Sequence, residues 1–198
     1  MHKFNLKSLC LVGIMLIITG GLACANFINN PGFETGNFTG WTTTPAAGGS
    51  FFGADGHNPH TGTYNAYFGA VGSGLDTISQ TFATTAGVIY DLSFWLSNPD
   101  SSGSNEFRVT FGGVIEQDLI NASDFGYTLY SFSIVTTGSS LTLEFAGRNG
   151  PGFFKLDDVS VEPRSASAVP DTGCSALLLG AALVGLILRR RRFAASAI

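Results

Sequence analysis

The side chains that could do acid–base or metal chemistry lie mostly in residues 26–163, a segment without cysteine. Its only histidines, His57 and His60, stand three apart in a loop, where solvated histidines are commoner than metal ligands. Glu116 and Asp118 form a carboxylate pair of the kind used in glycoside hydrolysis, but a segment with thirteen acidic side chains offers such pairs by chance. No serine-nucleophile elbow, HExxH helix or glycine-rich phosphate loop is present. The segment is predicted to be non-catalytic.

Asp157 is the acidic residue whose position most needs a partner. It shares the strand parity of Val159 and Val161, so we expect its side chain to face the core. A carboxylate on that face must be paired or metal-bound, because an unpaired buried charge is very costly. Asp158 has the opposite parity and takes this role instead if Phe154 is an inward residue.

Three aromatic residues are candidates for contact with a sugar. Trp95 lies on the strand face opposite Leu92 and Phe94, and an aromatic ring on an outer sheet face can stack on a sugar ring. Cover by a neighbouring loop is the alternative for this ring. Tyr64 and Tyr67, next to the loop that holds both histidines, form a second candidate patch.

These residues lie in a segment that reads as short β-strands, with no sustained helical spacing. In the clearest alternation, Phe107, Val109 and Phe111 are separated by polar residues. The candidate strands are residues 38–44, 50–54, 64–69, 75–83, 88–97, 106–111, 127–136, 141–145 and 153–161. Glycine-rich turns separate many of them. Short strands with one buried face each predict an all-β fold, an antiparallel β-sandwich of two packed sheets.

Composition limits the partners of this segment. About 140 residues are enough for one domain with its own core. The three cysteines, Cys10, Cys24 and Cys174, all lie outside it, so no disulfide stabilises it. Three cationic side chains stand against thirteen carboxylates, a net charge of −10, which excludes nucleic acid and anionic lipid as favourable partners. Neutral glycans and divalent cations remain open.

Three stretches of the segment carry a resemblance to a known fold. They are NPGFETGNFTGW at residues 30–41, AGVIYDLSFW at 86–95 and FKLDDVSV at 154–161. They resemble motifs of jelly-roll carbohydrate-binding modules of the galactose-binding-like superfamily. The resemblance implies a jelly roll and leaves the ligand open, because that fold hosts many binding roles.

The same resemblance implies a structural Ca²⁺ between the first and last strands. The carboxylates at the matching positions are Glu34 and Asp157. Calcium takes six to eight oxygen ligands, so backbone carbonyls or water must supply the rest. The alternative is that one carboxylate caps a turn and the other is solvated at a strand end.

The N-terminus has the layout of a secretory signal peptide, residues 1–25. Two lysines precede an apolar run at residues 9–18, and an A-x-A cleavage site ends at Ala25. The mature chain is expected to begin at Asn26. The alternative is a lipoprotein acylated at Cys24, but Gly21 stands where that signal needs an aliphatic residue.

The C-terminus has a three-part layout after a short linker, residues 164–168. An apolar run at residues 174–188 would rise about 22 Å as a helix, short of the roughly 30 Å hydrocarbon core. The arginines behind it cannot follow it across a bilayer, so they and residues 193–198 are expected to stay cytoplasmic. The signature before the run and the arginine cluster after it are Val169, Pro170, Asp171, Thr172 and Gly173, then Arg189, Arg190, Arg191 and Arg192.

This layout, residues 169–192, resembles the PEP-CTERM group of bacterial sorting signals, in the VPDSG variant with Thr172 in place of serine. The resemblance implies processing by an exosortase-type enzyme in a Gram-negative bacterium that makes exopolysaccharide. The alternative is an LPxTG wall-sorting signal, from which Val169 departs by replacing leucine.

Together these features predict an exported surface or extracellular-matrix protein with a non-catalytic β-sandwich. Its inner-membrane stage would be transient, and an exopolysaccharide is the expected partner of a weak glycan-binding site. An unrecognised glycan-active hydrolase is the remaining alternative.

Overall fold

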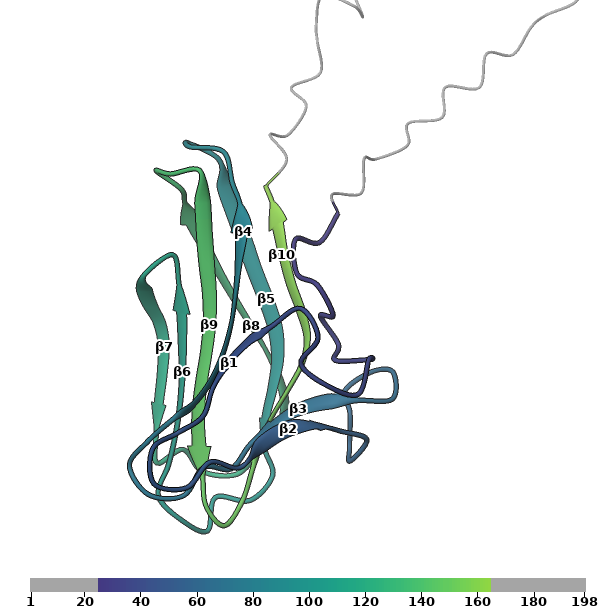
Figure 1. The fold of residues 1–198 in the computed structure, drawn as a ribbon, viewed down its shortest axis with the longest axis vertical. Helices are drawn as coiled ribbons and strands as arrows, with labels where there is room; N and C mark the ends of the chain where they lie inside the picture. Colours follow the sequence, from purple (N-terminus) through teal and green to yellow (C-terminus); the bar gives the residue numbers. More distant parts are fainter. Residues whose placement is uncertain (1–24, 165–198) are drawn as a thin grey trace, which may run out of the picture.

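The computed structural model describes residues 25–164, and the structural statements below concern that part of the chain. It is an all-β sandwich in which ten strands form two five-stranded antiparallel sheets (Figure 1). The strands are β1 (Thr42–Thr44), β2 (Phe52–Asp55), β3 (Asn65–Phe68), β4 (Asp76–Ala83), β5 (Ile89–Asn98), β6 (Asn105–Phe111), β7 (Val114–Ile120), β8 (Phe125–Val135), β9 (Ser140–Asn149) and β10 (Phe154–Pro163). The predicted antiparallel β-sandwich is confirmed. No helix of residues 25–164 is long and apolar enough to cross a membrane.

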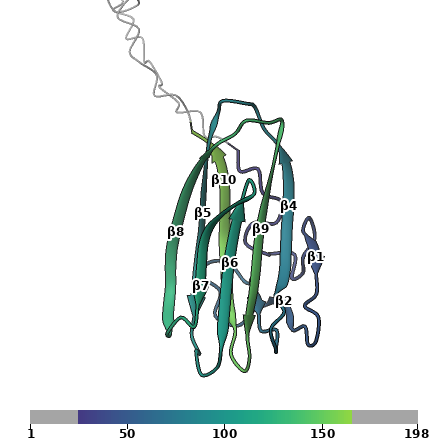
Figure 2. The same ribbon diagram turned by 90° about the vertical axis from the view of Figure 1, so that its left-hand side faces the viewer.

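The two sheets are built from strands far apart in the sequence. Sheet A has the order β1-β4-β9-β6-β7 and sheet B the order β2-β3-β10-β5-β8. Figure 2 shows the sandwich turned so that β4, β9, β6 and β7 of sheet A lie side by side. The last strand, β10, is the central strand of sheet B, so side chains from both ends of the domain meet on one sheet.

Aromatic rings from both sheets form the core. Phe94 of sheet B meets Phe145 of sheet A edge-on, with ring centroids 5.0 Å apart. Phe107, on the neighbouring strand β6, lies 6.1 Å from Phe145. The alternation predicted for β6 is confirmed, because Phe107, Val109 and Phe111 are all fully buried. These rings provide the apolar burial that stabilises a domain without disulfides.

The segment before β1 is irregular but tied to the sandwich. The Asn26 side chain donates to the Val159 carbonyl at 2.9 Å and accepts from the Val161 amide at 3.0 Å. Phe33 and Trp41 are buried with their rings stacked at 5.7 Å. The expected strand at residues 38–44 is therefore shorter than predicted and begins only at Thr42.

A β-bulge in β10 changes the expected direction of Asp157. Asp157 pairs with Trp95, and the register shifts before Ser160. Asp158 sits in the bulge with a positive φ of 47°. The extra residue lets both Leu156 and Val159 face the core, so Asp157 stands on the outer face of sheet B and not on the core face. The predicted inward orientation of Asp157 is wrong.

Strand β7 is an element that the sequence pattern did not predict. It forms a hairpin with β6 through Gly112 and Gly113, which both have positive φ (59° and 82°), as a two-residue turn requires. Of its side chains, Leu119 packs partly against the core. With most of its residues exposed, the strand lacks the strict alternation that marks a half-buried strand.

Candidate functional site

The outer face of sheet B is crossed by residues 56–64, which we call the covering loop. The Asp157 carboxylate accepts the backbone amides of His60 at 2.8 Å and Thr61 at 3.2 Å on one oxygen, and the Asp158 amide at 2.8 Å on the other. Asp158 contacts the His60 ring nitrogen Nδ1 at 2.6 Å and accepts the Thr61 hydroxyl at 2.5 Å. Two adjacent carboxylates of β10 thus clamp the middle of the loop.

Glu34 holds the far end of the same loop. Both of its carboxylate oxygens accept the Thr63 amide at 3.0 Å, and one accepts the Tyr64 amide at 3.2 Å. Gly62, with φ +64°, leaves no room for a side chain because a Cβ there would clash with the Glu34 carboxylate. The structure therefore brings Glu34 and Asp157, the two predicted metal ligands, to one loop.

Asp157 is the most perturbed carboxyl group of this region. Its side chain is fully buried under the covering loop. Burial raises the pKa of Asp157 to about 6; the amide hydrogen bonds oppose this shift and the neighbouring Asp158 carboxylate adds to it. Ionised Asp157 is therefore the group here that would gain most from a nearby cation.

The oxygens around Asp157 fit the ligand chemistry of calcium. Asn65 precedes Ala66, which pairs with Leu156, so it lies beside Asp157. The Asn65 Oδ1 atom is buried and has no hydrogen-bond partner in the described part of the chain. Residues 25–164 contain no group of three or more His, Cys, Asp or Glu side chains arranged to hold a metal. A calcium ion would thus need amide, backbone or water oxygens besides Glu34 and Asp157, and it stays a prediction.

Trp95 is on the outer face, as expected, but its ring is covered. The His60 ring stacks on it with centroids 3.9 Å apart and an interplanar angle of 18°. Tyr127 lies beside His60, at 5.2 Å, and donates its hydroxyl to the Asn58 carbonyl at 3.0 Å. The structure therefore agrees with the alternative for Trp95, in which a neighbouring loop covers this face of the ring.

Tyr67 belongs to a second aromatic group, formed with Phe51 and Phe153, which we call the aromatic patch. The three ring centroids lie 5.5 to 5.9 Å from one another. Phe51 is 57% exposed, and the other two rings are half-buried. Tyr67 lies over Gly53, where a Cβ would come within 3.0 Å of its ring, and Phe153 lies over Gly69 in the same way. Glycine thus lets two of the rings lie against the backbone.

A partly buried ion pair lies next to two rings of the patch. Lys155 Nζ lies 2.9 Å from Asp55 Oδ1, and it is 5.2 Å from the Tyr67 ring centroid and 5.9 Å from that of Phe153. Burial raises the pKa of Tyr67, and the Asp55 carboxylate adds to the shift. The Tyr67 hydroxyl is therefore protonated at neutral pH and can donate a hydrogen bond to a ligand.

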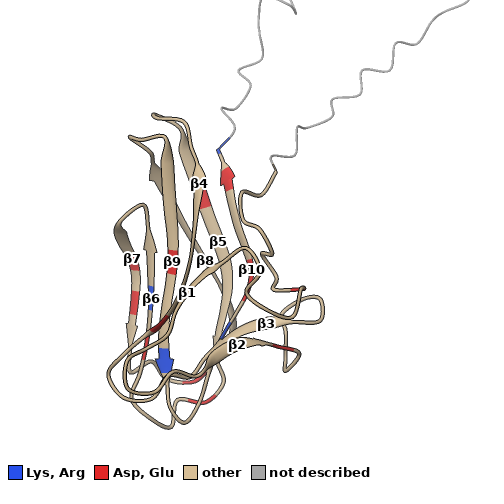
Figure 3. Cartoon of the chain, in the orientation of Figure 1, with Lys and Arg blue, Asp and Glu red and all other residues tan. Residues whose placement is uncertain are grey.

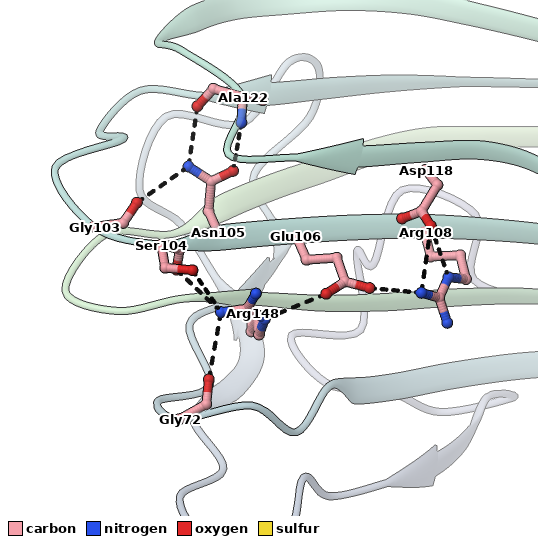
Figure 4. Close-up of polar contacts among 9 residues, drawn as sticks. All are labelled: Gly72, Gly103, Ser104, Asn105, Glu106, Arg108, Asp118, Ala122 and Arg148. Carbon is pink, nitrogen blue, oxygen red and sulfur yellow. Dashed lines mark hydrogen bonds and ion pairs between the residues drawn. The ribbon is translucent and has the colours of Figure 1, made fainter.

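The outer face of sheet A has a different chemistry. Figure 4 shows Glu106 between Arg108 and Arg148, at 2.6 Å and 3.4 Å, with Asp118 on the other side of Arg108 at 3.3 Å. Glu116, the other member of the Glu116–Asp118 pair, takes part in none of these ion pairs. Of the two carboxylates considered for glycoside hydrolysis, Asp118 is therefore ion-paired with Arg108. Figure 3 shows how few cationic positions the domain has.

The sequence candidates are thus distributed over two places on sheet B. Glu34, Asp157, Trp95 and His60 meet at the covering loop, and Tyr67 meets Phe51 and Phe153 in the aromatic patch. Tyr64 packs partly against the core, beside Gly36. Phe51 and Phe153 were not predicted as site residues. The sorting residues Val169–Gly173 and Arg189–Arg192 lie outside the described residues.

Comparison with known proteins defines the class of fold. No protein-family profile and no curated protein matches the chain. TmCBM61 in complex with β-1,4-galactotriose matches with a TM-score of 0.58 at 19% identity, over 71% of this chain and 99% of that chain. The CBM22-1 xylan-binding domain from Paenibacillus barcinonensis Xyn10C matches with a TM-score of 0.51 at 15% identity, over 75% and 100%. A Family 16 Carbohydrate Binding Module-2 matches with a TM-score of 0.51 at 17% identity, over 69% and 99%. The domain has the jelly-roll fold of carbohydrate-binding modules.

Proposed function

We propose that residues 26–163 form a non-catalytic module that binds a neutral polysaccharide through the aromatic patch. The observation that carries this proposal is the exposed ring of Phe51 beside Tyr67 and Phe153 on a jelly-roll fold. Aromatic rings offer sugars an apolar surface, and the Tyr67 hydroxyl adds a hydrogen-bond donor. A neutral ligand is favoured because the domain is strongly acidic, and its arginines on sheet A are paired with carboxylates.

The expected affinity is shallow. Few rings and hydrogen bonds support a dissociation constant near millimolar, or about 4 kcal/mol. Many copies on one surface would raise the effective affinity through avidity. Such binding suits a matrix or envelope component better than a carrier of a single sugar.

Replacement of the patch rings tests this proposal. Tyr67→Ala and Phe51→Ala should each abolish retardation of the domain in gels that contain xylan or β-1,4-galactan. Ile120→Ala, which truncates an exposed side chain on β7, should leave retardation unchanged. Circular dichroism melting of each variant separates lost binding from lost folding. Normal retardation of both patch variants would show that the aromatic patch is not the sugar-binding site.

Trp95→Ala serves as the competing variant in the same gels. If it alone abolishes retardation and keeps the melting temperature, the sugar contact lies under the covering loop and His60 must move to admit it. We expect the opposite result, lower stability with retained binding, because His60 stacks on this ring.

We further propose, from the sequence alone, that this module is exported and sorted by an exosortase-type enzyme. Intact-mass analysis of surface material should find a chain that starts at Asn26 and lacks Arg189 to Arg192. Alanine at Pro170 and Asp171 should trap the uncleaved protein in the membrane. A final product that keeps the arginines would defeat this proposal, and Thr172 joined to peptidoglycan would favour the wall-sortase alternative.

A further inference from the structure

Strand β8 is an open edge of sheet B. Among residues 25–164, only β5 pairs with it, and it is the last strand in the sheet order. With 11 residues it is also the longest of the ten described strands. The backbone N–H and C=O groups on the outer side of an edge strand form a template for a further strand. Figure 2 shows β8 at the margin of the sandwich.

The other three sheet edges carry features that discourage strand addition. β1 and β2 have only three and four residues. β7 carries Glu116 and Asp118 and is interrupted by a register shift against β6. β8 has no Lys, Arg, Asp, Glu or Pro (Figure 3). Edge strands are usually protected by short length, charge, proline or bulges. Strand β8 is long and has no charge or proline, and its one irregularity in register lies near its start.

The side chains of β8 also leave apolar surface uncovered. Leu129 is 51% and Val135 57% exposed. On the inner side, Tyr130, Phe132 and Ile134 pack against the core but remain only half-buried. A strand added at this edge would extend sheet B beside β8, and its own inward side chains would flank these three residues.

We propose that β8 pairs antiparallel with β8 of a second copy of this chain, so that two B sheets continue into one across a two-fold axis. A strand without charges presents no like-charge pair when it meets its own copy in this way. The nearest carboxylates are occupied: Asp91, opposite Ser133, is ion-paired with Arg164, and Asp124 accepts the Ser101 amide. In a domain of net charge −10, an eleven-residue edge strand without acidic side chains lets two copies approach with little charge repulsion.

The pairing is expected to be weak and to depend on local concentration. A ladder of eleven residues extends about 37 Å, but a single strand pair buries little surface besides the backbone. Chains held together at a surface or on one polymer would associate far better than dilute chains.

Sedimentation equilibrium of the full-length chain in density-matched detergent tests the proposal. The wild-type chain should show a monomer–dimer equilibrium at protein concentrations up to about 1 mM. At that concentration even a dimer with a dissociation constant of about 1 mM is substantially populated. Ser131→Lys puts a charge at the middle of β8 and should raise the dissociation constant at least tenfold. Thr142→Lys, at an exposed position of the interior strand β9, is the matched control and should dimerise like wild type.

Two results would overturn the proposal. One is a monomeric wild-type chain over this range. The other is equal dimerisation of wild type and Ser131→Lys, which would place the interface elsewhere, for instance in the C-terminal tail. The melting temperature of Ser131→Lys shows whether the variant is folded, and Leu129→Lys repeats the test at a second outward position of β8 if it is not.

Discussion

Calcium should raise the melting temperature of residues 26–163 by several degrees at pH 7.5 and by much less at pH 5. A ligand that binds only the folded state adds about 2.7 kcal/mol at a hundredfold excess over its dissociation constant. In a domain of this size that corresponds to a shift of several degrees. The ion would lie between the exposed Glu34 carboxylate and the buried Asp157 carboxylate, near the buried Asn65 Oδ1 atom.

The dependence on pH follows from the raised pKa of Asp157. Its pKa of about 6 in the folded domain lies above the ordinary value of 3.8. A raised pKa means that Asp157 contributes stability below about pH 4, and that this contribution is lost as the pH rises through about 6. Without a cation the ionised form costs at most about 3 kcal/mol at pH 7.5, at about 1.4 kcal/mol per pKa unit. Calcium would offset this cost only where Asp157 is ionised.

Asp157→Asn is the informative variant. It should remove the calcium-dependent shift in melting temperature and reduce the loss of stability between pH 5 and pH 7.5. Asp124→Asn is the matched control. Asp124 also accepts a backbone amide of a loop, but that amide belongs to Ser101 and not to the covering loop. It should keep the calcium shift. An unchanged melting temperature on chelation would contradict calcium binding. An equal calcium-dependent shift in Asp157→Asn would contradict binding at Asp157.

Phe145→Ala should destabilise the domain by about 3–5 kcal/mol, the usual range for deleting a large buried ring. Phe145 is fully buried and lies within 6.1 Å, centroid to centroid, of Trp41, Phe94 and Phe107. These rings belong to both sheets and to the opening segment, so the cavity would sit where three parts of the fold meet. Since whole domains are stable by about 5–15 kcal/mol, this single change can bring the domain close to unfolding.

Urea unfolding of the same segment measures this effect. Ile120→Ala removes an exposed aliphatic side chain and should change the free energy of unfolding by no more than about 0.5 kcal/mol. A loss below about 1.5 kcal/mol for Phe145→Ala would mean that the core can collapse around the missing ring, and that its aromatic packing is looser than the ring distances imply.

The sequence predicted the architecture wherever alternation was strict. Phe107, Val109 and Phe111 face the core as expected, because a strand with one buried face has a period of two. The same rule failed for Asp157, since the bulge at Asp158 inserts one residue and reverses the parity on either side of it. It also missed β7, an edge strand whose exposed residues carry no such period.

The candidate site was predictable only in part, for a similar reason. Tyr67 was identified as a possible sugar contact, but its neighbours Phe51 and Phe153 come from separate segments that meet only through strand pairing. The cover on Trp95 depends on His60, which is held in place by two carboxylates ninety-seven and ninety-eight residues later in the chain. Spacing along the sequence contains no signal for contacts of this range.

The most direct test of the central claim is an NMR titration of residues 26–163 with xylan or galactan fragments. Binding through the aromatic patch predicts that ring and amide signals of Phe51, Tyr67 and Phe153 shift together and saturate near millimolar sugar, while those of Trp95 and of Arg108 on sheet A stay in place. Shifts centred on Trp95 or on sheet A, with the patch signals unchanged, would contradict it.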